Sequence, residues 1–355
     1  MFSKLDKPFI IAGPCSAESA EQLDTVANTI SKSAKVKLLR AGIWKPRTRP
    51  NNFEGVGEVG LKWLVDAGKK NNIKTATEVA NASHVELSLK AGIDVLWIGA
   101  RTTVNPFSVQ EIADAVKGTN IPILVKNPIT PDLDLWVGAI ERIQGAGISN
   151  IAAIHRGFSS YEKTKYRNEP KWGIPVGLMQ LFPGLPIICD PSHIGGTRDL
   201  ILPIAQKALD MNMSGLMIET HPEPDSALSD AKQQITPARL LETIDQIIIR
   251  KLTPAKGIDY QLDDLRNKID KVDDEILNTL FKRFEIIDDI GHYKKNHQLT
   301  ILQVERWSEI LQTRSEKGMN NGLSKDFMEA ILKSIHKESV SRQTDILNHS
   351  KTKLD

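Results

Sequence analysis

The sequence predicts an α/β protein made of two parts, a (β/α)8 TIM barrel over residues 1–252 and an all-α three-helix domain that dimerises over residues 259–350. A repeat predicts the barrel, because short apolar or β-branched runs alternate with longer amphipathic stretches about eight times in the first part. A change of composition predicts the helical domain. Prolines and strand-like runs stop after the linker 253–258, which is rich in helix-breaking residues.

The eight predicted strands are short and end at residues that mostly carry polar or small side chains: Gly13, Ala41, Glu78, Gly99, Lys126, His155, Asp190 and Glu219. Helical patterns such as 20–33, 57–71 and 133–146 separate them. A doubly wound open sheet is the alternative. It would carry a glycine-rich phosphate loop after its first strand, and Gly13-Pro14-Cys15-Ser16 is not one.

The helical domain begins with one long helix, in which apolar residues recur at mixed three- and four-residue spacings over about 30 residues. Such a helix is about 45 Å long and needs a partner helix along its length. Asn320-Asn321-Gly322 then separates a second helix, about 303–317, from a third, about 324–348, and 351–355 form a tail.

The charge balance excludes several classes of partner. The chain has 46 Lys and Arg against 44 Asp and Glu, a net charge of +2, so it has no strong field for nucleic acid or an anionic membrane. Its apolar runs fall far short of the roughly 20 residues that cross a bilayer, and the N-terminal segment does not have the pattern of a secretory signal. We therefore expect a cytoplasmic protein whose two cysteines form no disulfide framework.

In a barrel of this kind the chemistry lies at the carboxyl ends of the strands. Five cations are predicted to meet there: Arg40, Lys45, Arg101, Lys126 and Arg156. One arginine at a strand end is more often part of a structural salt bridge. Five together would repel one another without a multiply charged anion, so the pattern indicates a phosphorylated substrate that also carries a carboxylate.

A second set of strand-end residues is suited to a metal: Cys15, His193, Glu219 and Asp230. Soft, intermediate and hard donors together favour a divalent ion of the manganese, iron, cobalt or zinc class, with a position left open for substrate. Taken singly, Cys15 could be a buried small apolar residue and Asp230 a helix N-cap. Cys189 is expected to point away from the barrel interior.

Ordered motifs over residues 8–245 resemble the type I β class of 3-deoxy-D-arabino-heptulosonate-7-phosphate (DAHP) synthases: Gly13-Pro14-Cys15-Ser16-Ala17-Glu18, Lys45-Pro46-Arg47-Thr48-Arg49-Pro50, Ile98-Gly99-Ala100-Arg101, His155-Arg156-Gly157, Cys189-Asp190-Pro191-Ser192-His193 and Glu219-Thr220-His221-Pro222-Glu223-Pro224. The resemblance implies condensation of phosphoenolpyruvate with erythrose 4-phosphate, the entry to the shikimate pathway. The resemblance also implies that Cys15, His193, Glu219 and Asp230 are the metal ligands. It implies that the five cations, together with Ala100, form the phosphoenolpyruvate site. Arg47, Thr48 and Asp190 then face the aldose.

The same resemblance implies roles for the metal and for Lys45. The metal acts as a Lewis acid on the aldehyde, and Lys45 handles a proton there with a pKa lowered by its cationic neighbours. The rival is the sister enzyme that uses arabinose 5-phosphate, which carries Lys-Ala-Asn-Arg where this chain has Lys45-Pro46-Arg47-Thr48. Arg47 offers a fixed fork for the phosphate of the shorter sugar, which favours erythrose 4-phosphate.

Residues 259–347 resemble the all-helical AroQ-type chorismate mutases, through Leu265-Arg266-Asn267-Lys268-Ile269-Asp270, Lys282-Arg283, Gly291-His292-Tyr293-Lys294 and Glu338-Ser339-Val340-Ser341-Arg342-Gln343. The resemblance implies rearrangement of chorismate to prephenate by Arg283, Lys294, Gln343 and Arg266, with Ser339 and Glu305 also facing the substrate. Ile301 stands where relatives have aspartate.

Helix geometry bears on Arg266. Arg283 and Lys294 lie within about 20° of each other on one helix face, whereas Arg266 is about 25 Å away and about 100° off that face. We therefore expect a homodimer in which the partner chain supplies Arg266. The alternative is a dimerising sensor that binds chorismate or prephenate without turnover. In either case we expect the bound ligand to inhibit the barrel.

Overall fold

The computed structural model describes residues 2, 8–45, 52–250 and 259–348. The chain divides into two compact units, Met1–Leu252 and Thr253–Asp355.

The first unit is a closed barrel of eight parallel strands in sequential order, with β1 pairing to both β2 and β8. The strands are β1 Phe9–Gly13, β2 Val36–Arg40, β3 Lys74–Val79, β4 Val95–Ile98, β5 Ile123–Lys126, β6 Ile151–His155, β7 Ile187–Cys189 and β8 Gly215–Glu219. Each ends within one residue of the expected position. The predicted (β/α)8 fold is confirmed.

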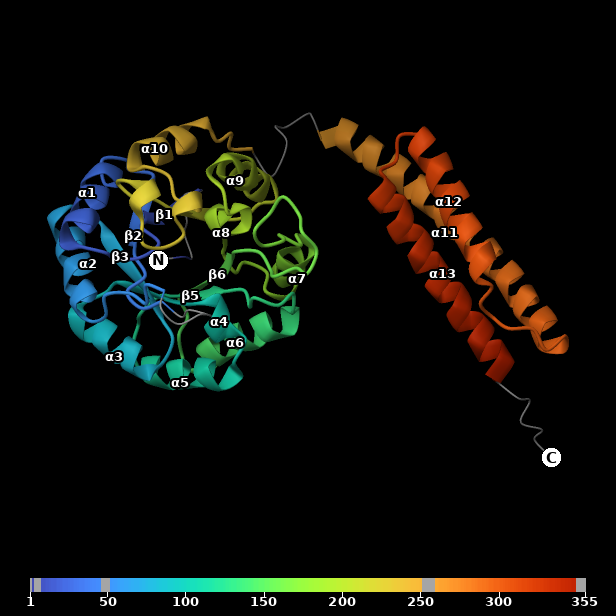
Figure 1. Ribbon diagram of the computed structural model, residues 1–355, viewed down its shortest axis with the longest axis horizontal. Coiled ribbons are helices and arrows are strands. Elements are labelled where there is room, and N and C mark those ends of the chain that lie inside the picture. The colour runs from blue at the N-terminus through green and yellow to red at the C-terminus, as the bar shows by residue number, and fades with distance from the viewer. Residues whose placement is uncertain (1, 3–7, 46–51, 251–258, 349–355) are drawn as a thin grey trace. The chain divides into compact units, whose positions relative to one another are not determined.

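Helices surround the strands (Figure 1). They are α1 Ala20–Ile30, α2 Val59–Lys70, α3 Ala82–Ala91, α4 Ala100–Thr103, α5 Pro106–Val116, α6 Leu133–Gly145, α7 Gly173–Leu181, α8 Pro191–Gly195, α9 Ile201–Asp210 and α10 Pro237–Gln246. Short 3-10 turns η1 Arg198–Leu200, η2 Pro224–Ser226 and η3 Ala231–Gln233 complete the unit. Side-chain caps fix where several helices begin; Ser19, Asn81 and Asp132 each accept a hydrogen bond from a backbone N–H of the first turn.

The strands are buried on both faces, as in most parallel sheets. Alternate side chains fill the barrel interior, among them Ile11, Leu38, Trp97 and Leu124. The other face of each strand packs against the helices and includes Cys189, which points outward as expected. The apolar interior supports the strand ends, where the polar residues lie.

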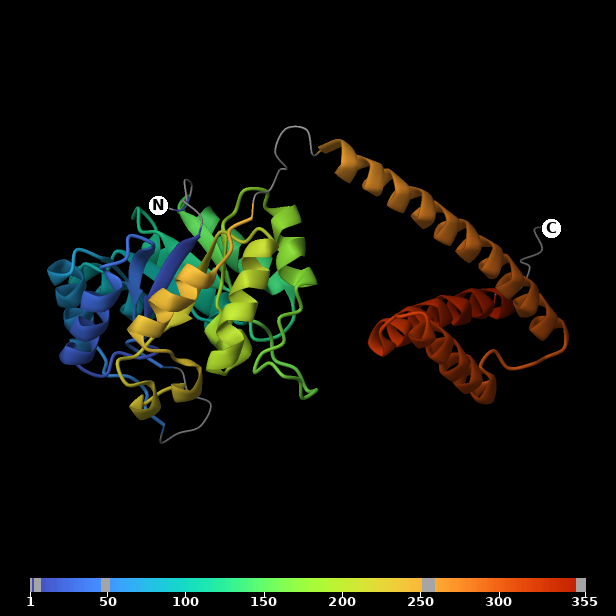
Figure 2. The same cartoon turned by 90° about the horizontal axis from the view of Figure 1, so that it is seen from above.

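The second unit consists of three helices, α11 Asp259–Asn296, α12 Val304–Asn320 and α13 Lys325–Asn348, close to the predicted bounds. Helix α13 packs against both α11 and α12 (Figure 2). The first half of α11 has no such cover: Leu265, Ile269, Val272 and Ile276 are 50–59% exposed. This apolar stripe repeats every three or four residues, and no described residue of the unit covers it.

Across the residues that the structure describes, no helix combines the length and apolarity needed to cross a membrane.

Candidate active sites

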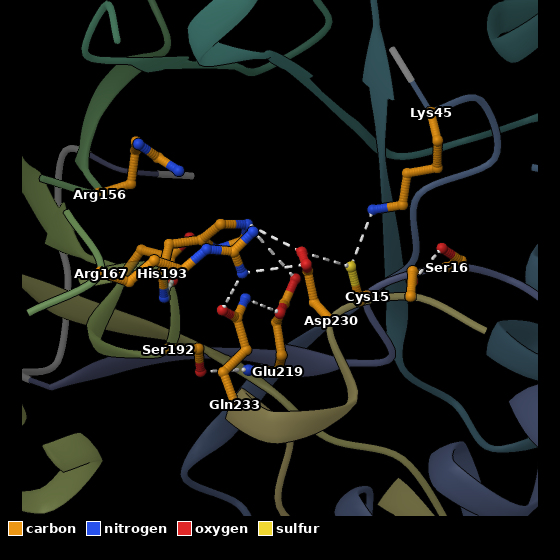
Figure 3. A network of polar contacts seen from close by, with 12 residues as sticks. Cys15, Ser16, Lys45, Arg156, Arg167, Ser192, His193, Glu219, Asp230 and Gln233 are labelled. Carbon is orange, nitrogen blue, oxygen red and sulfur yellow. Dashed lines mark hydrogen bonds and ion pairs between the residues drawn. The ribbon is translucent and has the colours of Figure 1, made fainter. Parts of the chain in front are cut away.

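The four predicted metal ligands meet at the carboxyl end of the barrel (Figure 3). Donor atoms of Cys15, Glu219 and Asp230 all lie within 4.8 Å of one another, and Cys15 Sγ is 3.4 Å from Asp230 Oδ2. His193 Nε2 lies 3.8 Å from Glu219 Oε1 and 4.0 Å from Asp230 Oδ2. A thiol and two carboxylates therefore form a compact cluster, and the imidazole of His193 lies beside its two carboxylates.

The local chain fixes the orientation of His193. Asp190 caps α8 by accepting a hydrogen bond from the His193 backbone N–H at 3.0 Å, and its Oδ2 lies 2.8 Å from His193 Nδ1. This leaves Nε2 facing the two carboxylates. A carboxylate behind a histidine is the usual arrangement around a metal-binding imidazole, because it sets the tautomer and the ring plane.

Asp230 is not a helix cap, although it precedes η3. Its side chain makes no capping hydrogen bond, and its backbone adopts a left-handed conformation with φ of 48°. A non-glycine residue in that region is strained by about 1–3 kcal/mol, and such strain tends to occur at functional sites. The structure thus favours the ligand interpretation of Asp230 over the capping one.

The electrostatics of the cluster suit a bound dication. Burial raises the pKa of Glu219, but His193 and Arg40 outweigh burial and lower it to about 2; the pKa of Asp230 is also well below its usual range. Burial, then the charge of Glu219, raises the pKa of the Cys15 thiol to about 12. Two ionised carboxylates thus lie beside a thiol that cannot ionise against them. A divalent ion would offset both charges and favour the thiolate.

Two of the five cations are buried and paired with carboxylates. Arg40 Nη1 donates to Glu219 Oε1 at 2.6 Å, and its Nη2 donates to the Cys15 carbonyl at 3.2 Å. Lys126 Nζ donates to Asp190 Oδ2 at 3.0 Å. Both side chains are almost fully buried, so each is held at the site by a fixed anion.

Arg156 Nη1 donates to Asn168 Oδ1 at 2.7 Å. Burial lowers its pKa to about 10, and the nearby guanidinium groups of Arg167 and Arg101 contribute, although Asp190 opposes them. Cations thus face one another here, as expected of an anion site. Arg101 itself is exposed, and Ala100 is buried at the start of α4.

Lys45 corrects one expectation. Its Nζ lies 3.0 Å from Cys15 Sγ, which places it beside the candidate metal ligands. Burial acts to lower the Lys45 pKa, but the acidic groups Cys15 and Glu219 beside it outweigh burial, so the pKa is raised rather than lowered. Arg47 and Thr48 lie outside the described residues.

Trp97 is a residue of the site that sequence reasoning missed. It is fully buried in the barrel interior, with its ring 4.8 Å from Arg40 Cζ and 5.9 Å from Lys126 Nζ. Its Nε1–H donates to Glu78 Oε2 at 2.9 Å, and the Glu78 carboxylate packs directly over Gly99, where a Cβ would meet it at 2.1 Å. Trp97 lies in an apolar strand, where the pattern predicts only packing.

Arg167 and Gln233 were also missed, because both lie in irregular segments. Arg167 Nη1 donates to Asp230 Oδ1 at 3.0 Å and to Gln233 Oε1 at 2.6 Å. Gln233 Nε2 in turn donates to Glu219 Oε2 at 2.6 Å. These contacts tie together the two carboxylates of the cluster (Figure 3).

His155 ends β6 but does not face the site. Its ring packs against Trp136 of α6 and against Phe158 and Trp172, with centroids 5.3–6.4 Å apart. Burial, with help from the charge of Arg156, lowers the His155 pKa to about 3. His155 is a neutral packing residue between the barrel wall and its outer helices.

In the helical unit, four of the predicted residues cluster between α11 and α13. Arg283 Nη1 donates to Ser339 Oγ at 2.8 Å, and Gln343 Nε2 donates to the Ser339 carbonyl at 3.2 Å. Lys294 is buried and donates to the Ile301 carbonyl at 2.6 Å. Within the described part of the chain, Gln343 Oε1 is buried without a hydrogen-bond partner. A polar cluster that includes a buried lysine and a half-buried arginine is suited to an anionic ligand.

Two further predicted residues lie apart from this cluster. Arg266 is exposed and pairs with Asp263 of its own helix at 3.0 Å, and Glu305 is exposed in the first turn of α12. Between α12 and α13, the rings of Trp307 and His336 stack at 3.9 Å. Burial lowers the pKa of His336, and the charge of Arg283 adds to the effect. Nothing in the sequence pattern separated Trp307 from ordinary helix packing.

The fold and its two polar clusters place the chain in the class of (β/α)8-barrel enzymes that carry an appended helical domain. The sequence model of the DAHP synthetase I family matches residues 4–253. The chain belongs to this family. Residues 265–344 match the chorismate mutase type II family. The chain therefore carries a DAHP synthase domain, which is a transferase, and a chorismate mutase domain, which is an isomerase.

Individual relatives agree with this assignment. Phospho-2-dehydro-3-deoxyheptonate aldolase of Thermotoga maritima is 34% identical over 249 residues, 70% of this chain and 71% of the relative. Its crystal structure, titled as DAHP synthase, matches with a TM-score of 0.60 over 67% of each chain. A 2-dehydro-3-deoxyphosphooctonate aldolase of Stenotrophomonas maltophilia is more distant, at 29% identity over 64% of this chain and 85% of the relative.

Proposed function

We propose that the barrel condenses phosphoenolpyruvate with erythrose 4-phosphate to give DAHP and phosphate, and that the helical domain rearranges chorismate to prephenate. One observation carries the barrel assignment: a thiol, an imidazole and two carboxylates converge beside buried cations at one barrel mouth. The more similar DAHP synthase relative, together with Lys45-Pro46-Arg47-Thr48, favours erythrose 4-phosphate over arabinose 5-phosphate.

In this proposal Cys15, His193, Glu219 and Asp230 hold a divalent ion of the manganese, iron, cobalt or zinc class. When bound, such an ion supplies Lewis acidity toward the sugar aldehyde. The protein contributes the preset geometry, because Asp190 orients the histidine and the carboxylates are already ionised at neutral pH.

The cations bind phosphoenolpyruvate. Arg40, Lys126 and Arg156, with Lys45 and Arg101, pair with its phosphate and carboxylate and stabilise negative charge that grows during condensation. Lys45 is protonated at neutral pH, since its pKa is raised, and its role in handling a proton near the aldehyde is assigned on the family resemblance. Arg47, Thr48 and Asp190 are assigned to the aldose on the family resemblance.

The chorismate reaction needs no nucleophile, so the pocket acts by holding the substrate and stabilising charge. Arg283 pairs with a carboxylate, and Lys294 and Gln343 face the breaking ether bond. Ser339 orients Arg283 through their 2.8 Å contact. The remaining carboxylate is assigned to Arg266 of the partner subunit, because Arg266 of the same chain lies about 25 Å from Arg283 along α11 and on another face.

The exposed α11 stripe supports a homodimer formed by a second copy of this chain. Leu265, Ile269, Val272 and Ile276 follow a coiled-coil spacing and are half or more exposed in one chain. An antiparallel copy of α11 would cover the stripe and bring Arg266 toward the opposite pocket. We further propose that chorismate or prephenate bound in this pocket inhibits the barrel, because prephenate is formed downstream of the barrel reaction.

A paired assay tests the two assignments. Phosphoenolpyruvate loss with erythrose 4-phosphate and chorismate loss are followed separately in the full chain, in Cys15→Ser and in Lys294→Ala. Cys15→Ser should abolish the first activity alone, and Lys294→Ala the second alone. Cys189→Ala, at the outward-facing cysteine, is the matched control and should keep both. A wild-type dimer that binds chorismate without consuming it would make the helical domain a sensor instead.

A further inference from the structure

Two neighbouring residues, Arg167 and Asn168, connect the metal cluster with the phosphoenolpyruvate cations. They lie in the long connection between β6 and α7. The backbone N–H groups of both donate to the Ile194 carbonyl, at 3.0 and 3.2 Å. At Gly196 a Cβ would lie 2.4 Å from Arg167 Cβ, so the connection packs closely on the end of α8. The pair is therefore fixed on the helix that carries His193.

Arg167 acts on the carboxylate side of the cluster. Its Nη1 donates to Asp230 Oδ1 at 3.0 Å and to Gln233 Oε1 at 2.6 Å. Gln233 is buried, and its Nε2 donates to Glu219 Oε2 at 2.6 Å, so it links Arg167 to the second carboxylate. One guanidinium thereby fixes both candidate carboxylate ligands, one directly and one through a single amide (Figure 3).

Asn168 acts on the other side and is itself buried. Its Nδ2 donates to the His193 carbonyl at 2.6 Å, and its Oδ1 accepts from Arg156 Nη1 at 2.7 Å. A movement of the histidine ligand therefore reaches a substrate-binding arginine through one side chain. Arg167 and Asn168 together contact, directly or through one residue, three of the four ligands and one of the cations.

We propose that Arg167 and Asn168 are positioning residues that couple the metal site to the phosphoenolpyruvate site, an inference that rests on the proposed ligand set. Arg167 holds the carboxylates in their ligating arrangement. Asn168 fixes the positions of His193 and Arg156 relative to each other. Binding of either ligand therefore strengthens binding of the other, and the coupling is reciprocal.

Mn²⁺ titration into the chelator-treated full chain, with and without saturating phosphoenolpyruvate, measures both effects without turnover. Arg167→Gln should weaken Mn²⁺ binding about tenfold or more, the usual effect of losing a group that orients a ligand. Asn168→Leu, similar in size but unable to make either hydrogen bond, should reduce the factor by which phosphoenolpyruvate tightens Mn²⁺ binding. Thermal unfolding of each metal-free variant checks that the barrel is intact.

Arg198→Gln is the matched control, because Arg198 donates to the carbonyls of Ala231 and Gln234 beside Asp230 but contacts no candidate ligand. Equal weakening in Arg198→Gln would mean that the effect is loop disruption and would overturn the proposal. So would unchanged Mn²⁺ affinity in Arg167→Gln or an unchanged coupling factor in Asn168→Leu. If the wild-type chain binds no Mn²⁺, or if Cys15→Ser binds it equally well, the ligand set itself is wrong and both proposals fall.

Discussion

Trp97 shows how one apolar residue can contribute to a charged site. Its ring lies below Arg40 and Lys126, where a cation–π contact is worth about 0.5–2 kcal/mol. We expect Trp97→Leu to raise the KM for phosphoenolpyruvate roughly 3- to 30-fold with little change in the KM for erythrose 4-phosphate. Trp97→Phe keeps a ring face, loses the hydrogen bond to Glu78 and should show a smaller increase. Initial-rate kinetics decide; an equal rise in both KM values would indicate lost packing only.

His155 predicts a specific pH dependence of stability. Its folded pKa of about 3 lies below the value of about 6.5 for an unfolded histidine. As the pH falls below about 6.5, His155 takes up a proton in the unfolded chain but stays neutral in the folded chain. The stability that this residue contributes at neutral pH is therefore lost. Between pH 7 and pH 5 the barrel of the wild type should lose about 2 kcal/mol more than that of His155→Phe.

Urea unfolding of the two proteins at both pH values measures this difference. The comparison cancels the other titrating groups that both proteins share. Equal losses of stability in the two proteins would show that the histidine is protonated in the folded barrel. That result would contradict its burial in an aromatic cluster.

At the scale of elements, periodicity located the strands and helices, because burial on both strand faces or on one helix face leaves a repeating pattern. The ends of β1, β5, β6 and β8 fall at the predicted residues. Residues in irregular segments, such as Arg167, Asn168 and Gln233, carry no such pattern, and their contacts depend on tertiary folding. The raised pKa of Lys45 could not be foreseen either, since it depends on which charges lie nearest.

Helix α11 carries a prediction about shared sites. Arg266→Ala and Lys294→Ala should each remove chorismate rearrangement. The two residues that serve one pocket are expected to come from opposite chains. In a hybrid dimer one pocket holds both intact residues and the other holds neither. Mixing the two inactive proteins under conditions that exchange subunits should therefore restore up to about a quarter of the wild-type rate, for random exchange and half-active hybrids.

Native mass spectrometry of differently labelled chains confirms that hybrids form. Their formation without any return of rearrangement would show that Arg266 and Lys294 do not serve a shared pocket.

For the whole molecule, the proposed feedback requires that the ligand of one domain changes the rate of the other. Prephenate should lower phosphoenolpyruvate consumption in the wild type. Arg283→Ala, which loses the guanidinium held by Ser339, should keep the uninhibited barrel rate and resist prephenate. Initial rates over a prephenate series test this; equal inhibition of both proteins would place the effector outside the helical pocket. Thermodynamic linkage is reciprocal: if prephenate weakens the binding of the barrel substrates, those substrates must weaken the binding of prephenate by the same factor.

We propose that one chain performs a metal-dependent condensation and a metal-independent rearrangement at separate sites. The most direct measurement removes the metal and follows both reactions in the same sample. Chelation should abolish phosphoenolpyruvate consumption, leave chorismate consumption intact, and be reversed by adding Mn²⁺. Phosphoenolpyruvate consumption that persists with erythrose 4-phosphate in fully metal-depleted protein would contradict the roles proposed for Cys15, His193, Glu219 and Asp230.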